Sequence, residues 1–185
     1  MNSRGKWILA LLLCGFFLLG VVTMHIIPEN ERKEAVYLEQ QKSPATMDMK
    51  RCKQYESPYM GDHSNLIALF QSLPMGEKLG PFKLHPEDFS AELYYLETDW
   101  LTGEENIRIN LFYNSTAAFA LIGNLEKITY YFSGAAYQAT RADIEKVFPE
   151  PAQILKSGNW KTNVQDKFLD EAFLKQYTDI VITKI

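Results

Sequence analysis

The segment Gly61-Asp62-His63-Ser64 contains the residue types that a serine hydrolase uses: a carboxylate, an imidazole and a hydroxyl. A serine becomes a nucleophile when a histidine takes its proton and a third group orients that histidine. Three consecutive side chains at the start of a helix point in different directions, so they cannot converge on one substrate. Asp62 as a helix N-cap, with Ser64 in the first turn, explains the same residues without chemistry. We therefore predict no catalytic residue here and no enzyme activity.

Metal and cofactor sites are not predicted either. His63, His85, Glu87 and Asp88 are metal-ligating residue types, but they lack the His-x-x-x-His or Glu-x-x-His spacing that places ligands on one helix face. The stretch from Gly76 to Gly80 is no phosphate loop, because no strand precedes it and no Lys-Ser/Thr pair follows it.

Cys52 is the one cysteine outside the N-terminal apolar run, so the sequence has no disulfide framework. No histidine is recognisably paired with it, which argues against a catalytic thiol. We predict a free or half-buried thiol, and an intermolecular bridge remains the alternative.

Arg141 is the residue whose chemistry most suggests binding. It follows Thr140 in a predicted capping box, where a positive charge is unfavourable to the helix dipole, so we expect a carboxylate partner. Asp62 is the candidate partner. The pair is either an exposed ion pair of little energetic weight or part of a site that receives an anionic peptide terminus or glycan group.

Tyrosines also suggest a binding surface. Predicted strands place Tyr94, Tyr95, Tyr130 and Tyr131 on both faces of a sheet, because side chains alternate along a strand. Ordinary sheet packing explains them, and an aromatic face that grips a peptide or glycan is the sharper hypothesis.

All of these residues follow a predicted N-terminal membrane helix that would tether them to a bilayer. An apolar run of 21 residues extends from Trp7 to Ile27. At about 1.5 Å per helical residue it spans roughly 31 Å, close to the hydrocarbon thickness of a bilayer. It is longer than a cleaved signal peptide's apolar stretch and lacks an Ala-x-Ala-like site. Leu13 before Cys14 does not suit lipidation, so we prefer an uncleaved anchor.

Charges orient the anchor and limit the partners. Arg4 and Lys6 precede the run without an acidic residue, so the positive-inside rule predicts a cytoplasmic N-terminus and an extracytoplasmic C-terminal domain at the cell membrane. Residues 28–185 hold 17 basic and 23 acidic residues, a net charge of −6. Nucleic acid and an anionic lipid surface are therefore not expected partners.

Beyond the anchor (1–28) we expect a stalk and linker (29–58), an α+β domain (59–150) and a C-terminal helical extension of that domain (151–185). Apolar spacing predicts a helix from Asp62 to Leu73 and another after Thr140. Strands are predicted at 82–85, 91–98, 106–113, 127–132, 137–139 and 179–183, with a hairpin loop at 99–105.

Asn114-Ser115-Thr116 also matches a glycosylation sequon, but we prefer it as the N-cap of a short helix that ends at Gly123-Asn124. The predicted fold is a mostly antiparallel sheet with short helices packed on one face.

Residues 55–150 resemble a bacterial family described as a domain of unknown function, DUF4825. The resemblance rests on Ser57-Pro58-Tyr59-Met60-Gly61-Asp62-His63-Ser64-Asn65, Leu73-Pro74, Tyr113-Asn114 with Phe119-Ala120-Leu121-Ile122-Gly123-Asn124, Ile128, Tyr137 and Thr140-Arg141. His63 stands where Asn is expected. The family occurs in Gram-positive bacteria behind one membrane anchor or a lipoprotein signal. The resemblance implies an extracytoplasmic accessory or sensing domain and no particular activity.

These observations predict a membrane-anchored, non-catalytic domain that binds an envelope protein or peptide, with Tyr59, Asp62, Asn65 and Arg141 as candidate binding residues. An envelope hydrolase and a structural envelope protein are the alternatives.

Overall fold

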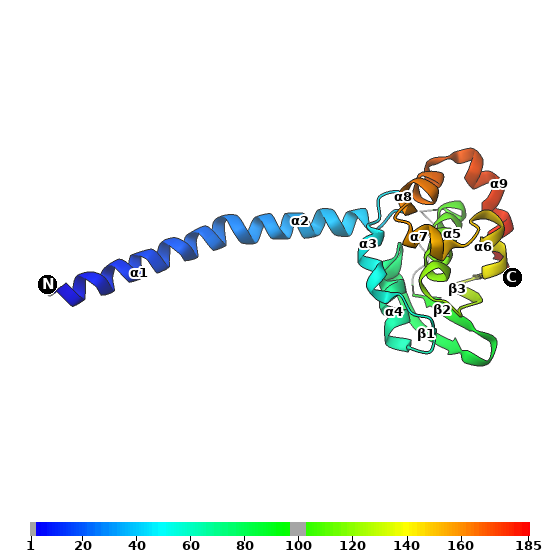
Figure 1. The fold of residues 1–185 in the computed structure, drawn as a ribbon, viewed down its shortest axis with the longest axis horizontal. Coiled ribbons are helices and arrows are strands. Elements are labelled where there is room, and N and C mark those ends of the chain that lie inside the picture. The colour runs from blue at the N-terminus through cyan, green and yellow to red at the C-terminus, as the bar shows by residue number, and fades with distance from the viewer. Residues whose placement is uncertain (1–2, 97–102) are drawn as a thin grey trace. The chain divides into compact units, whose positions relative to one another are not determined.

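The computed structural model describes residues 3–96 and 103–185; within the first ten residues, only the side chain of Trp7 is described (Figure 1). The chain divides into two compact units, Met1–Glu39 and Gln40–Ile185.

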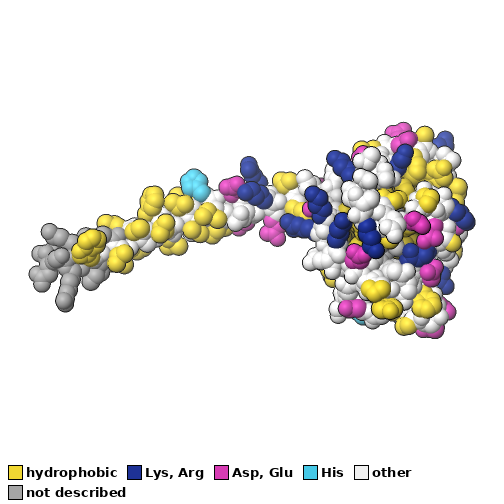
Figure 2. Space-filling model, viewed as in Figure 1, with side chains coloured by type: hydrophobic (Ala, Val, Ile, Leu, Met, Phe, Trp, Pro, Cys, Tyr) yellow, Lys and Arg dark blue, Asp and Glu magenta, His cyan; other side chains and the backbone are white. Residues whose placement is uncertain are grey.

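The N-terminal unit is helical and apolar over its first part. It comprises α1 (Ser3–Val21), a π-helical turn (Val22–Ile26) and most of α2 (Ile27–Gln40). Among the described residues, one helix, Leu11–Gln40, is long and apolar enough to cross a membrane. Figure 2 shows hydrophobic side chains along the first described part of this helix and charged side chains along its later part. The predicted apolar helix is confirmed, and its orientation remains a prediction.

The second unit contains a five-stranded sheet in the order β1-β2-β3-β4-β5. The strands are β1 (Leu79–His85), β2 (Ser90–Tyr95), β3 (Lys127–Phe132), β4 (Ala135–Thr140) and β5 (Thr183–Lys184). All neighbouring strands pair antiparallel except β2 and β3, which are parallel. The predicted α+β class and mostly antiparallel sheet are confirmed, with this parallel pair as the exception.

The parallel pair exists because a helix separates its strands in the sequence. This helix, α5 (Glu104–Leu121), replaces the strand predicted at 106–113, so that prediction is wrong. The predicted short helix that ends at Gly123-Asn124 is confirmed as the second half of α5, which ends at Leu121. In the first half, Ile107 is buried and Ile109 is half-buried although they lie on different sides of the helix. Apolar residues therefore alternate there as they would in a strand.

The same error affected the predicted cap at Asn114. Asn114 lies in the interior of α5, is fully buried, and donates from Nδ2 to the Pro74 carbonyl at 2.8 Å. Ser115 hydrogen-bonds the Tyr130 hydroxyl at 2.8 Å, also in the core. Asn114 is therefore neither a helix cap nor an accessible glycosylation site.

Shorter helices surround α5. They are α3 (Met49–Cys52), α4 (His63–Ser72), α6 (Arg141–Val147), α7 (Pro151–Lys156), α8 (Trp160–Asn163) and α9 (Glu171–Val181), with 3₁₀ turns at Lys53–Tyr55, Gly76–Lys78, Pro86–Asp88 and Gln165–Leu169. Predicted caps are confirmed at α4, where Asp62 accepts from the Asn65 amide at 3.0 Å, and at α6, where Thr140 accepts from the Asp143 amide at 3.2 Å.

The sheet has an inner face against α5 and an outer face. Tyr95, Tyr130 and Tyr137 are buried on the inner face, where Tyr95 stacks on Phe132 with ring centroids 4.9 Å apart. Tyr94 and Tyr131 point to the outer face and are half-buried. The predicted distribution of tyrosines over both faces is confirmed.

Two further expectations concern segment ends. The predicted hairpin loop falls largely on residues 97–102, which lie outside the described residues, and Glu104 and Glu105 already belong to α5. Of the strand predicted at 179–183, only Thr183 is in β5, because α9 continues to Val181.

Candidate functional site

The chain around Tyr59 is held against the end of α5. The Ser57 amide donates to the Leu121 carbonyl at 2.9 Å, and the Gly123 amide donates back to the Ser57 carbonyl at 2.9 Å. The Met60 amide donates to Asn124 Oδ1 at 2.6 Å. A Cβ on Gly123 would lie 3.0 Å from the Pro58 carbonyl oxygen, so the close approach depends on glycine.

Arg141 holds the same helix end from another side. Its Nε, Nη1 and Nη2 donate to the carbonyls of Leu125, Phe119 and Ile122 at 2.9, 3.0 and 2.7 Å. The last carbonyls of a helix have no intrahelical donor, and a cation there also suits the helix dipole. We call these contacts of Ser57, Gly123, Asn124 and Arg141 the α5 closure.

The predicted pairing of Arg141 with Asp62 is wrong. The carboxylates near Arg141 are Glu126 at 3.4 Å and Glu145 at 3.6 Å. The Arg141 side chain is only 14 % exposed, because the carbonyls it serves are internal. Its main donors are already occupied, so its role in ligand binding stays a prediction that the contacts do not favour.

The other predicted binding residues have separate surroundings. Asp62 caps α4, and Asn65 Nδ2 donates to the Tyr55 carbonyl at 2.8 Å. The His63 ring meets the Phe82 ring edge-on, with centroids 5.1 Å apart. Tyr59 is 70 % exposed and is the one whose side chain is free to meet a partner. The structure thus brings Tyr59 and Arg141 to the same helix end through backbone contacts rather than into a shared cleft.

The outer sheet face is a second candidate. Tyr94 and Tyr131 stack with ring centroids 4.7 Å apart, and Lys83 Nζ lies 5.2 Å from the centre of the Tyr94 ring. The Tyr94 hydroxyl donates to Glu92 Oε2 at 2.7 Å, and Lys83 Nζ donates to that hydroxyl at 3.3 Å. His85 Nε2 lies 3.3 Å from Glu92 Oε1. We call Lys83, His85, Glu92, Tyr94 and Tyr131 the outer tyrosine face.

These contacts perturb the titration of the face. The hydrogen bond from Tyr94 holds the pKa of Glu92 below its usual value, and the same bond raises the pKa of Tyr94. The bond to Tyr94 also raises the pKa of Lys83. At neutral pH the face therefore carries the Glu92 carboxylate, the Lys83 ammonium and a neutral Tyr94 phenol beside the Tyr131 ring, which suit a ligand with both polar and apolar groups.

Sequence reasoning did not single out Lys83 or Glu92, and it considered His85 only as a possible metal ligand. The signal was available in part, since Glu92 and Tyr94 alternate with the apolar residues of β2. Lys83 could not be assigned to this face from sequence, because only the pairing register of β1 with β2 shows that it lies opposite Glu92.

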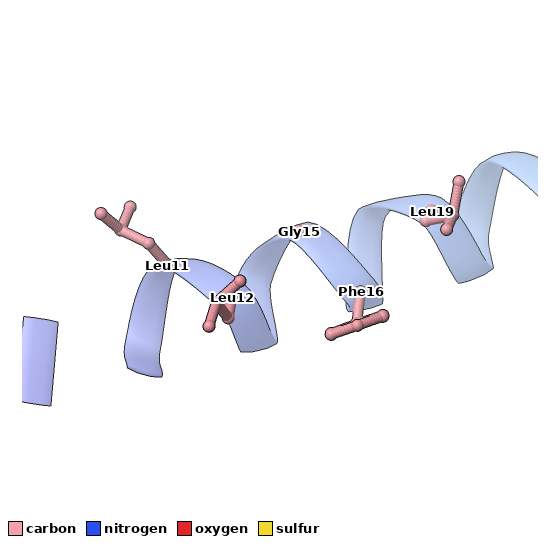
Figure 3. Close-up of a pocket in the computed structure, with 5 residues that line it drawn as sticks. All are labelled: Leu11, Leu12, Gly15, Phe16 and Leu19. Atoms are coloured by element: carbon pink, nitrogen blue, oxygen red, sulfur yellow. The ribbon is translucent and has the colours of Figure 1, made fainter. Parts of the chain in front are cut away.

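The apolar helix surface and the Cys52 thiol do not offer functional groups. A shallow, open depression on the apolar helix is lined by Leu11, Leu12, Gly15, Phe16 and Leu19 (Figure 3). Every side chain lining it is apolar, as expected of a surface that contacts lipid. Cys52 is 1 % exposed, and burial followed by the charge of Asp48 raises the pKa of its thiol to about 12, so the thiol is inert.

The structure thus defines an α+β domain that follows an apolar helix. Residues 52–142 match the family model described as Domain of unknown function (DUF4825), just under half of the chain, which confirms the resemblance. The match includes Tyr59 and Arg141 as well as the end of α5 between them. Neither curated proteins nor solved structures gave a match.

Arg141→Met should lower the free energy of unfolding by about 2–4 kcal/mol, because three internal carbonyls lose a charged donor. Urea unfolding of the detergent-solubilised full chain measures this, and Arg141→Lys should recover part of the loss. Lys146→Met on the same helix removes only an exposed pair with Asp143 and should change the value by less than about 0.5 kcal/mol. Unchanged stability in Arg141→Met would contradict a structural role for these three hydrogen bonds.

Gly123→Ala should cost about 1–3 kcal/mol of stability, because its Cβ would crowd the Pro58 carbonyl. The control is Gly61→Ala, where an added Cβ meets nothing within 4 Å. The same urea titration distinguishes them, and equal midpoints for the two variants would contradict the close approach described above.

Proposed function

We propose that this protein is a membrane-anchored, extracytoplasmic, non-catalytic domain that binds a protein or peptide partner in the cell envelope. The helix that contains residues 7–27 is its membrane anchor, and the outer tyrosine face is its binding surface. The single observation that carries the binding role is the half-buried Tyr94–Tyr131 stack with charged hydrogen-bonding groups at its edge.

The chemistry of the face supports a polypeptide partner. Tyrosine combines a flat apolar body with a polar tip, and it is enriched where proteins bind one another. Lys83, Tyr94 and Glu92 hold one another in place through hydrogen bonds, so little side-chain freedom is lost when a partner binds.

A non-catalytic role is supported by what the hydrolase-like residues do. Asp62 is used as a helix cap, and the His63 ring packs against Phe82 rather than Ser64. The envelope hydrolase remains the alternative enzyme hypothesis. It requires turnover of an envelope substrate that disappears with Ser64→Ala or His63→Ala.

Cysteine labelling of intact cells tests the orientation. A Lys161→Cys variant should react with a membrane-impermeant maleimide, since residue 161 is exposed on α8. A Ser3→Cys variant should react only after the membrane is permeabilised. The parent chain should give almost no background, because Cys52 is buried and Cys14 would lie within the membrane anchor, where a water-soluble maleimide does not reach it. The opposite labelling pattern would invert the topology.

Site-specific photocrosslinking tests the binding surface. A benzoyl-phenylalanine at Gln138, whose register places it beside Thr129 and Glu92 on the outer face, should give a discrete protein adduct in cells. The same group at Lys161 on α8 is the matched control and should not give that adduct. Tyr94→Ala with Tyr131→Ala should reduce the adduct about tenfold or more, as expected for loss of aromatic anchors. If no adduct forms at Gln138, the structural-protein hypothesis is favoured.

A further inference from the structure

A polar pocket lies between the start of α5 and α9, and the outer tyrosine face plays no part in it. Its volume is about 340 Å³. The lining residues are Glu104, Glu105, Arg108, Leu174, Lys175, Thr178 and Asp179. We call it the α5–α9 pocket.

Ion pairs hold part of its wall in place. Arg108 Nη1 lies 2.5 Å from Asp179 Oδ1, and Arg108 Nη2 donates to the Ile182 carbonyl at 2.7 Å. Lys184 Nζ donates to Glu104 Oε1 at 2.8 Å, which ties the start of α5 to β5. These pairs neutralise Asp179 and Glu104, so they leave two lining charges, Glu105 and Lys175, without an ion-pair partner among the described residues.

Two buried polar atoms in the lining residues lack hydrogen bonds. They are Thr178 Oγ1, on a residue only 7 % exposed, and Arg108 Nε. Buried polar groups are almost always paired in folded proteins, so unpaired ones at a pocket indicate where a bound polar molecule belongs. This observation is independent of the charge pattern and points to the same place.

The charges select the class of ligand. A simple anion would meet the carboxylates of Glu104, Glu105 and Asp179, and a simple cation would meet Arg108 and Lys175. A molecule with one ammonium and one carboxylate avoids both conflicts, because Glu105 can take the first and Lys175 the second. The volume suits a molecule of amino-acid size.

We propose that the α5–α9 pocket binds a free α-amino acid, with its ammonium at Glu105 and its carboxylate at Lys175 and the Thr178 hydroxyl. The proposal goes beyond partner binding at the outer tyrosine face, because it assigns a small-molecule site to a different part of the fold.

Isothermal titration of the detergent-solubilised full chain tests this. The probes are L-alanine, D-alanine, L-glutamate and L-lysine, and at least one should bind. Two derivatives are then made of the alanine enantiomer that binds better, or of L-alanine if the two do not differ. The N-acetyl derivative lacks the ammonium, and the amide derivative lacks the carboxylate. Each derivative of a binding amino acid should bind at least about tenfold more weakly, since a charge-assisted bond is lost. No binding by any of the four probes at 10 mM, or equal binding of the derivatives, overturns the proposal.

Variants assign the binding to this pocket. Glu105→Gln, Lys175→Met and Thr178→Val should each weaken binding about tenfold, while the midpoint of urea unfolding stays close to that of the parent. Glu171→Gln and Lys161→Met remove exposed charges outside the pocket and should leave binding unchanged. Binding that survives in all three pocket variants places the ligand elsewhere and overturns the proposal. The crosslink at Gln138 tests only the outer tyrosine face, so its failure leaves the amino-acid titration unaffected.

Discussion

The free carbonyls at the end of a central helix are the constraint on which this fold depends. α5 is buried along most of its second half, so water cannot satisfy its last carbonyls. Arg141 supplies three donors to carbonyls at and just beyond that end, and the chain from Ser57 to Met60 completes the closure. The contacts join segments that are far apart in the sequence, and they fix where β3 can begin after α5.

This view changes how the family resemblance is understood. Tyr59, Asp62, Asn124 and Arg141 lie in the segments that carry the resemblance, and three of them serve backbone groups. A motif of polar residues at fixed spacing can therefore mark residues that hold the backbone together, such as the α5 closure, as readily as a binding site. Tyr59 differs because its ring is exposed beside the α5 closure.

Much of the fold could be predicted from sequence, and the wrong predictions concern features that depend on tertiary contacts. Asp62 and Thr140 were assigned correctly as caps because capping is local chemistry. The alternation of Ile128, Tyr130 and Phe132 identified β3, since one face of that strand is buried. The first half of α5 was assigned to a strand because Ile107 and Ile109 contact protein on different sides of the helix, so apolar residues alternate there. The partners of Arg141 were missed because they are backbone carbonyls, which every residue carries and which no sequence pattern distinguishes. Of the outer tyrosine face, Tyr94 and Tyr131 were predicted, because aromatic residues follow the period of a strand. Lys83 and Glu92 were not, because their contacts depend on how the strands pair.

The sheet also has an implication for the order of events during synthesis. β1 and β2 can form a hairpin early, but β3 must wait until α5 has crossed over them, and such long-range pairing is slow. β5 is made of residues 183–184, so the outer edge of β4 gains this hydrogen-bonding neighbour only after the more than forty residues that follow β4 have left the ribosome. Until then β4 is an open template for other extended chains. A nascent molecule of this kind therefore needs protection from its neighbours until β5 emerges.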